Sequence, residues 1–213
     1  MITKDQMPAI TIDIETFSGW NKPSLDDIEA PSNYKDPDKI KAYKEENLDK
    51  IWRKQALNSL KGQIICIGYA LNDGDVEVLF DEDEKKLLMQ FNDVISKYPY
   101  GILIGHNLLR FDIPWLYHRS IKYRLSSLKS ILPHGKRDTD MINDTMSLFS
   151  STIYGSDGYY SLDEIAKFLG LNPKESSGAD IHDMFVAKEY DKIKEHCKYD
   201  VELTRQVYKL ITE

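Results

Sequence analysis

The chain has 213 residues, a formal net charge of −7 and a hydrophobic fraction of 41%. A chain of this length and apolar content can bury the core of one ordinary domain, which excludes a disordered or fibrous protein. Its sequence has neither an apolar run long enough to span a membrane nor a basic-then-apolar signal pattern, so we expect no membrane contact and a cytoplasmic location. Two distant cysteines, Cys66 and Cys197, are expected to be buried thiols and not a disulfide framework.

The first predicted element is a strand over residues 8–15. Apolar and polar residues alternate along it, with Ile10, Ile12 and Ile14 on one face and Thr11, Asp13 and Glu15 on the other. Because successive side chains of a strand point to opposite faces, Asp13 and Glu15 point in the same direction.

Residues 18–60 separate this strand from the next, which is far longer than an ordinary hairpin loop. The pair Asp36-Pro37 predicts a helix start, followed by about twenty helical residues. The apolar residues of this helix, Trp52 among them, need burial against something. We interpret 18–60 as an insertion, either a clamp over a substrate or a docking arm for a partner or second subunit.

The remaining predicted elements are a mixture of strands and helices. They are strands over 63–71 and 76–80 joined by a turn at 72–75, a helix over 83–98, a short strand over 102–105, a helix that opens at Asp112, a helix with a capping box from Ser161 to Glu164, and a last helix from about Asp191. Strands followed by helices, with an early hairpin, predict an α/β domain with a mixed sheet. We expect residues 1–213 to form this single domain.

The charge is unevenly distributed. Residues 110–137 contain one acid, Asp112, and seven basic residues, namely Arg110, Arg119, Lys122, Arg124, Lys129, Lys136 and Arg137. A net negative charge is unusual for a protein that binds nucleic acid. We nevertheless predict that this basic strip contacts a nucleic-acid backbone; the alternative is a solvated basic loop.

Four carboxylates carry the main functional signal: Asp13, Glu15, Asp112 and Asp200. Each alone has an ordinary explanation, as a strand-surface, helix-cap or helix-surface residue. Together they are expected to face one cleft, where like charges would repel one another without a cation. Hard oxygen ligands suit Mg²⁺ or Mn²⁺, and two such ions can clamp the attacking and leaving oxygens of a phosphodiester.

The contexts of these residues resemble the DEDD superfamily of 3′–5′ exonucleases, most closely the proofreading exonuclease domains of family B DNA polymerases. The motifs are Asp13-Ile-Glu-Thr16, Asn107-x-x-x-Phe111-Asp112 and His196-Cys-Lys-Tyr-Asp200. Asp138-Thr139-Asp140 and Ser161–Ala166 are similar to the linking segment and the penultimate helix of these domains. The resemblance covers roughly 1–17 and 60–213 and implies a ribonuclease H-like mixed sheet flanked by helices.

The resemblance also implies an activity: two-metal hydrolysis of single-stranded DNA from its 3′ end, with release of nucleoside 5′-monophosphates. In that activity Asp13 would bridge both ions, Glu15 and Asp112 would help to hold them, and Asp200 would ligate the ion that activates the nucleophile. Thr16, Phe17, Asn107 and Phe111 would touch the terminal nucleotide. For Phe17 and Phe111 a role in the hydrophobic core is the alternative.

His196 departs from the superfamily pattern, which has a Tyr four residues or a His five residues before the last Asp. Here a histidine stands four residues before Asp200. Residues spaced i, i+4 share one helix face, so His196 can orient or deprotonate a water near Asp200. The alternative fifth residue, Tyr199, lies about 100° around the helix from Asp200. His106 is expected to be a satisfied turn residue, and His118, His134 and His182 to be surface residues.

Other functions stay open. An exoribonuclease on the same fold differs only in contacts to the 2′-hydroxyl. A non-catalytic binding module would be expected to lack a carboxylate, and an endonuclease of the same fold would not need His196. The chain carries no polymerase, so a separate polymerase or repair protein is a candidate partner.

Overall fold

The computed structural model describes residues 7–131, 141–150, 159–173 and 178–213. Its centre is a five-stranded sheet in the order β3-β2-β1-β4-β5. The strands are β1 (Ala9–Phe17), β2 (Gln63–Leu71), β3 (Glu77–Phe80), β4 (Ile102–Gly105) and β5 (Ile142–Asp144). β2 runs antiparallel to β1 and β3, whereas β4 runs parallel to β1 and β5. The mixed sheet confirms the predicted ribonuclease H-like α/β class.

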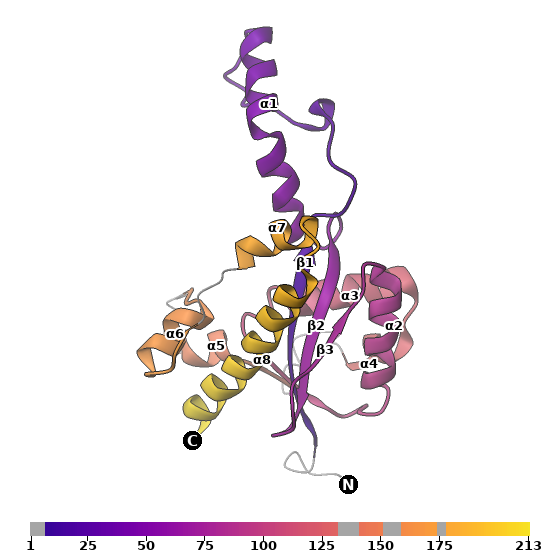
Figure 1. The fold of residues 1–213 in the computed structure, drawn as a ribbon, viewed down its shortest axis with the longest axis vertical. Helices are drawn as coiled ribbons and strands as arrows, with labels where there is room; N and C mark the ends of the chain where they lie inside the picture. The colour runs from indigo at the N-terminus through magenta and orange to yellow at the C-terminus, as the bar shows by residue number, and fades with distance from the viewer. Residues whose placement is uncertain (1–6, 132–140, 151–158, 174–177) are drawn as a thin grey trace.

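Helices cover both faces of this sheet (Figure 1). One layer contains α2 (Glu84–Ile95), α3 (Asp112–Tyr123) and α4 (Ser126–Ile131); the other contains α5 (Thr145–Phe149), α6 (Leu162–Phe168), α7 (Ile181–Val186) and α8 (Tyr190–Thr212). α8 lies against the sheet and contacts β1, β2, β3 and β4. None of the helices in the described ranges combines the length and the apolar character that a membrane span requires.

The alternation in β1 decides which side chains reach each layer. Ile10, Ile12 and Ile14 belong to a buried cluster with side chains of α2 and α3. Asp13 and Glu15 lie on the opposite face, beneath α8. A register shift between Glu15 and Thr16 interrupts the pairing of β1 with β2 beside these carboxylates. Such bulges commonly re-aim side chains next to active sites.

Local signals in the sequence set the ends of several elements. Asp83 caps α2 by accepting a hydrogen bond from the amide of Lys85 (2.9 Å). Ser161 and Glu164 form the predicted capping box of α6. The predicted hairpin turn joins β2 and β3, and the Gly74 amide donates to the carbonyl of Leu71 (2.9 Å).

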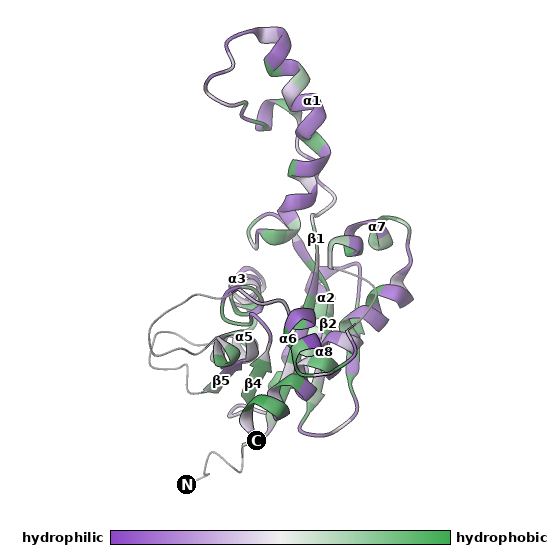
Figure 2. Ribbon diagram, turned by 90° about the vertical axis from the view of Figure 1, so that its left-hand side faces the viewer, coloured by the Kyte–Doolittle hydropathy of each residue, from purple (hydrophilic) through white to green (hydrophobic). Residues whose placement is uncertain are grey.

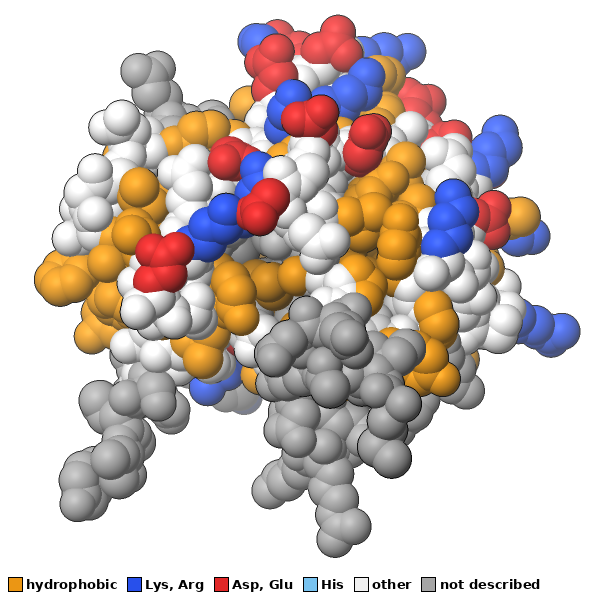
Figure 3. Space-filling model, turned by 90° about the horizontal axis from the view of Figure 1, so that it is seen from below, with side chains coloured by type: hydrophobic (Ala, Val, Ile, Leu, Met, Phe, Trp, Pro, Cys, Tyr) orange, Lys and Arg blue, Asp and Glu red, His pale blue; other side chains and the backbone are white. Residues whose placement is uncertain are grey.

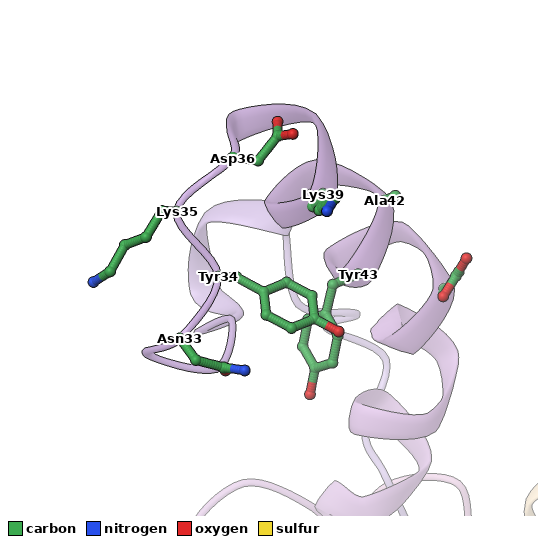
Figure 4. A pocket seen from close by; sticks show the side chains of 8 residues that line it. Asn33, Tyr34, Lys35, Asp36, Lys39, Ala42 and Tyr43 are labelled. Atoms are coloured by element: carbon green, nitrogen blue, oxygen red, sulfur yellow. The ribbon is translucent and has the colours of Figure 1, made fainter.

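α1 (Pro37–Lys54) projects away from the sheet and is largely hydrophilic (Figures 1 and 2). The predicted start is confirmed, because Asp36 accepts a hydrogen bond from the Asp38 amide (2.9 Å). None of the α1 residues is buried. At its far end the ring of Tyr43 meets that of Tyr34 edge-to-face, with centroids 5.6 Å apart (Figure 4). Among the described residues, the apolar side chains of α1 therefore do not gain the expected full burial, and their contacts with the rest of the domain are at the base of the helix.

An aromatic cluster fixes that base to the rest of the molecule. Trp52 packs against Phe17 and His182 and donates its indole N–H to the Gly19 carbonyl (3.0 Å). Arg53 forms an ion pair with Asp183 of α7 (2.7 Å). The prediction of His182 as a surface residue is wrong: it is buried, and its Nδ1 lies 3.1 Å from the Ser18 hydroxyl.

The basic strip predicted over 110–137 is also wrong in part. Arg119 is buried and forms an ion pair with the buried Glu84 (3.0 Å), and Lys122 lies 3.6 Å from the same carboxylate. Arg110 and Arg124 are exposed, while Lys136 and Arg137 lie outside the described residues, as does the side chain of Lys129. Figure 3 views the end of the molecule opposite α1, where acidic and basic side chains are interspersed.

Candidate active site

The site forms where α8 approaches β1 and β2 closely. Gly68 of β2 pairs with Asp13 of β1. A Cβ atom at Gly68 would lie 2.8 Å from Val201 Cγ2 and 2.9 Å from Cys197 Sγ. Only glycine leaves room here for α8, so this residue allows the helix to bring its side chains over the carboxylates of β1.

His196 connects the two elements. Its Nε2 lies 3.5 Å from Glu15 Oε1 on β1 and 3.5 Å from Asp200 Oδ2 one turn further along α8. His196 and Glu15 are buried, at 4% and 7% exposure. One ligand atom from each of the three residues lies within 4.8 Å of the others. The spacing of four places Asp200 beside the imidazole, as the i, i+4 argument predicts, and the packing of α8 against β1 adds Glu15.

Asp13 lies beside this trio. Ligand atoms of Asp13, Glu15 and Cys197 also fall within 4.8 Å of one another. The Cys197 thiol is fully buried and donates to the Asp13 carbonyl oxygen (3.6 Å). Burial raises the pKa of this thiol well above its ordinary value, so it stays protonated. Cys66 is buried as well, and both cysteines are free thiols, as predicted.

Asp112 approaches from the other side of β1. Its Oδ1 accepts a hydrogen bond from the amide of Ile14 (3.1 Å), the residue between Asp13 and Glu15. Burial raises the pKa of Asp112 to about 8, although the amides of Asp112 and Ile14 act in the opposite direction; the negative charges of Asp144 and Asp200 raise it further. A carboxyl group of this kind ionises readily only when a positive charge is nearby.

The residues expected to touch a terminal nucleotide divide into two groups. Thr16 is buried, and Asn107 and Phe111 are half-buried. Thr16 and Phe111 line a cleft that also contains Glu15. Asn107 adopts a left-handed backbone conformation (φ 54°), and its carbonyl accepts from the Phe111 amide (3.0 Å). Phe17 instead has 0% exposure within the aromatic cluster, which favours the alternative of a core residue.

Two residues next to the site complete its surroundings, and the sequence argument missed the first. Asp144 caps α5, accepting from the Met146 amide (3.0 Å), and accepts from the Leu109 amide (3.0 Å). It thereby ties β5 to the Asn107–Asp112 segment. An aspartate at the N-cap of a helix is a recognisable sequence signal. Asp144 also ends β5, however, and this strand has only three residues and is not predicted from the sequence. His106 is satisfied as expected, with ring nitrogens 2.9 Å from Thr145 Oγ1 and 3.0 Å from the Tyr160 carbonyl.

The donor set fits a divalent cation. It combines the carboxylates of Asp13 and Glu15 on β1 with that of Asp200 on α8, and His196 lies beside them; Asp112 belongs to neither group of ligand atoms and accepts a hydrogen bond from the Ile14 amide. Oxygen-rich sites of this type suit Mg²⁺ or Mn²⁺. A cation near Asp112 would also favour its ionised form, which burial disfavours.

The chain belongs to the family described as predicted 3′–5′ exonucleases related to the exonuclease domain of PolB, whose model matches residues 63–212. The match includes Asp112, His196 and Asp200 and begins after Asp13 and Glu15. An uncharacterized protein of Methanocaldococcus jannaschii (MJ0365) is 31% identical over 170 residues, which span 74% of this chain and 90% of that protein.

DNA polymerases are also similar to the chain. One from Archaeoglobus fulgidus is 25% identical over 148 residues, covering 66% of this chain and 19% of the polymerase. The catalytic subunit of DNA polymerase delta from Glycine max is 31% identical over 81 residues, 38% of this chain and 7% of that subunit. The family B DNA polymerase of Pyrobaculum calidifontis shares the fold, with a TM-score of 0.63 and 14% identity over 96% of this chain and 24% of that one. The chain thus spans a small part of the polymerases that it resembles.

Proposed function

We propose that this chain is a metal-dependent 3′–5′ exonuclease that removes nucleoside 5′-monophosphates from the 3′ end of single-stranded DNA. The observation that carries the proposal is the convergence of Glu15, His196 and Asp200 within 4.8 Å of one another, next to Asp13. Asp112 lies across β1, bonded to the amide of Ile14. Membership of the PolB-related exonuclease family supports this chemistry.

Asp13, Glu15, Asp112 and Asp200 would hold two divalent cations, Mg²⁺ or Mn²⁺. Bound there, the cations would offset the charge that develops on the scissile phosphate and make the attacking water more acidic. The four carboxylates come from three elements, β1, α3 and α8, and the close approach of Glu15 to Asp200 supports a preformed site for a cation.

The protein's own side chains supply the remaining chemistry. His196 would accept a proton from the water, because its Nε2 lies 3.5 Å from Asp200 Oδ2, beside the cation that would bind the water. Glu15 faces the same nitrogen as Asp200, with its Oε1 3.5 Å from Nε2, and helps to orient the imidazole. Thr16, Asn107 and Phe111 would position the terminal nucleotide.

The named similarity to DNA polymerases supports DNA as the substrate, and a separate polymerase or repair protein as a partner. An exoribonuclease is the alternative, since the same carboxylates serve either sugar. The presence of all four carboxylates argues against a binding module that has lost catalysis.

The test is digestion of a 5′-labelled single-stranded DNA and the matching RNA, each with Mg²⁺ and with Mn²⁺. Asp13→Ala serves as the inactive control. We expect a ladder of shortening labelled products from DNA that is absent in the control. Equal or faster digestion of RNA would support the exoribonuclease, and binding of either strand without cleavage would refute an exonuclease.

A further inference from the structure

The insertion helix α1 forms one wall of a cleft that opens beside the carboxylates. The cleft has a volume of about 700 Å³. Its floor contains Glu15 and Thr16 of β1 together with Phe111, which precedes Asp112. The wall is one face of α1 and the short helix η3 (Gln55–Leu57) that follows it. The insertion therefore lies next to the site although it is outside the region that the family model matches.

The α1 residues along this wall share one helical face. They recur at spacings of three and four: Glu46, Asp49, Lys50, Arg53, Lys54 and, in η3, Leu57. Residues at such spacings lie above one another on a helix. The wall is thus a continuous surface that extends from the floor of the cleft outward along α1.

The wall is anchored rigidly where it meets the site. The Thr16 hydroxyl, one residue after Glu15, donates to the Ala56 carbonyl (2.7 Å). A Cβ at Gly62 would lie 2.6 Å from the Gln55 carbonyl oxygen, so the backbones are in close contact there. Together with the Trp52 and Arg53 contacts, these interactions fix the base of α1 relative to the carboxylates.

The wall carries three basic side chains, Lys50, Arg53 and Lys54, and two acidic ones, Glu46 and Asp49. Asp49 is compensated by Arg53 (2.6 Å) and Lys22 (3.8 Å). Lys50 and Lys54 are exposed, and among the described residues neither forms an ion pair. They are one helical turn apart, about 6 Å along the axis. Two lysine side chains at this spacing can bind consecutive phosphates of a single-stranded nucleic acid.

Apolar groups complete the pattern. Leu57 is 71% exposed at the base of the wall, and the ring of Phe111 lines the floor. Proteins that bind single strands combine basic side chains along the backbone with apolar or aromatic platforms for the bases. The cleft offers both, next to the carboxylates that would hold the terminal phosphodiester.

We propose that α1 is a substrate arm: the strand enters the site along this wall, and Lys50 and Lys54 bind the phosphates of the nucleotides on the 5′ side of the scissile bond. The inference rests on the proposed exonuclease function and extends it to a binding segment outside the metal site. It assigns the insertion to the substrate and not to a protein partner.

The test compares Lys50→Gln/Lys54→Gln with Lys41→Gln/Lys44→Gln. The control pair removes the same charge from α1 and does not line the cleft. Affinity for a fluorescent single-stranded DNA of six nucleotides is measured by anisotropy at several salt concentrations. Hydrolysis of the p-nitrophenyl ester of thymidine 5′-monophosphate, which is too small to reach α1, is measured in parallel.

We expect the cleft variant to bind the strand about tenfold more weakly and to flatten the slope of log K against log salt by about 1.4, roughly 0.7 for each lost phosphate contact. Ester hydrolysis should stay at the wild-type level, and the control pair should match the wild type throughout. Wild-type affinity and slope in the cleft variant would overturn the arm. A wild-type protein that binds the strand but cleaves neither substrate would instead overturn the exonuclease proposal.

Discussion

Replacement of Asp112 by asparagine should stabilise the metal-free protein and abolish its activity. In the folded protein, burial raises the pKa of Asp112 to about 8, from the ordinary 3.8 of an exposed carboxyl group. The folded state therefore binds one more proton than the unfolded state between these two values. Its free energy of unfolding falls as the pH rises through this window, because stability decreases with pH wherever the folded state binds more protons.

The magnitude follows from the width of the window. One pKa unit corresponds to about 1.4 kcal/mol, so at pH 7 the shift costs the protein about 4 kcal/mol. The amide introduced by Asp112→Asn does not titrate, and its oxygen can still accept the hydrogen bond from Ile14. In EDTA the variant should melt higher than the wild type at pH 7, by roughly 2–4 °C for each kcal/mol gained. The difference should vanish near pH 4.

Thermal denaturation at pH 4 to 8, with and without Mn²⁺, measures both effects. Added Mn²⁺ should raise the melting temperature of the wild type more than that of the variant, because the variant lacks a carboxylate ligand. Asp75→Asn, at an exposed position, is the matched control and should change neither curve. Parallel curves of melting temperature against pH for wild type and Asp112→Asn would refute the reasoning.

Three further substitutions test other parts of the structure. His196→Ala should lower kcat about 100-fold, as expected for loss of a general base, with little change in Mn²⁺ affinity. His196→Tyr should retain part of the rate. Wild-type turnover in both variants would show that the histidine takes no part in catalysis. Gly68→Ala should force α8 away from β1 and lower the melting temperature, and it should lower kcat by up to about 100-fold. An unchanged melting temperature and kcat would contradict the close approach of α8 to Gly68. Glu84→Gln should reduce the free energy of unfolding, measured in urea, by about 3–5 kcal/mol, because it leaves the charge of Arg119 buried and uncompensated. The double variant Glu84→Gln/Arg119→Met should recover part of that loss. Equal stability of the single and double variants would exclude this cause.

Local signals in the sequence predicted most of the fold. The alternation of β1, the turn at 72–75 and the caps at Asp36, Asp83 and Ser161 depend on residues close together in the chain. The spacing of His196 and Asp200 likewise predicted their common helix face. Each of these features is a property of one element, which is why sequence alone sufficed.

The errors arose where distant segments meet. The local charge pattern predicts Arg119 in an exposed basic strip, because its partner, Glu84, lies 35 residues earlier in the chain. His182 was assigned to the surface, although Trp52 and Ser18 enclose it. β5 was missed because three residues are too few for a periodic pattern, and its side chains gain their burial from β4. Tertiary contacts of this kind leave no local trace.

The hydrogen bond between Cys197 and Asp13 joins residues 184 positions apart in the chain. Contacts that close such long loops form late in folding, after hairpins and helices whose partners are near in sequence. The sheet and its neighbouring helices can therefore assemble before α8 docks. An intermediate of that kind would lack His196 and Asp200 beside Glu15, so under the proposed function only fully folded copies would cut nucleic acid.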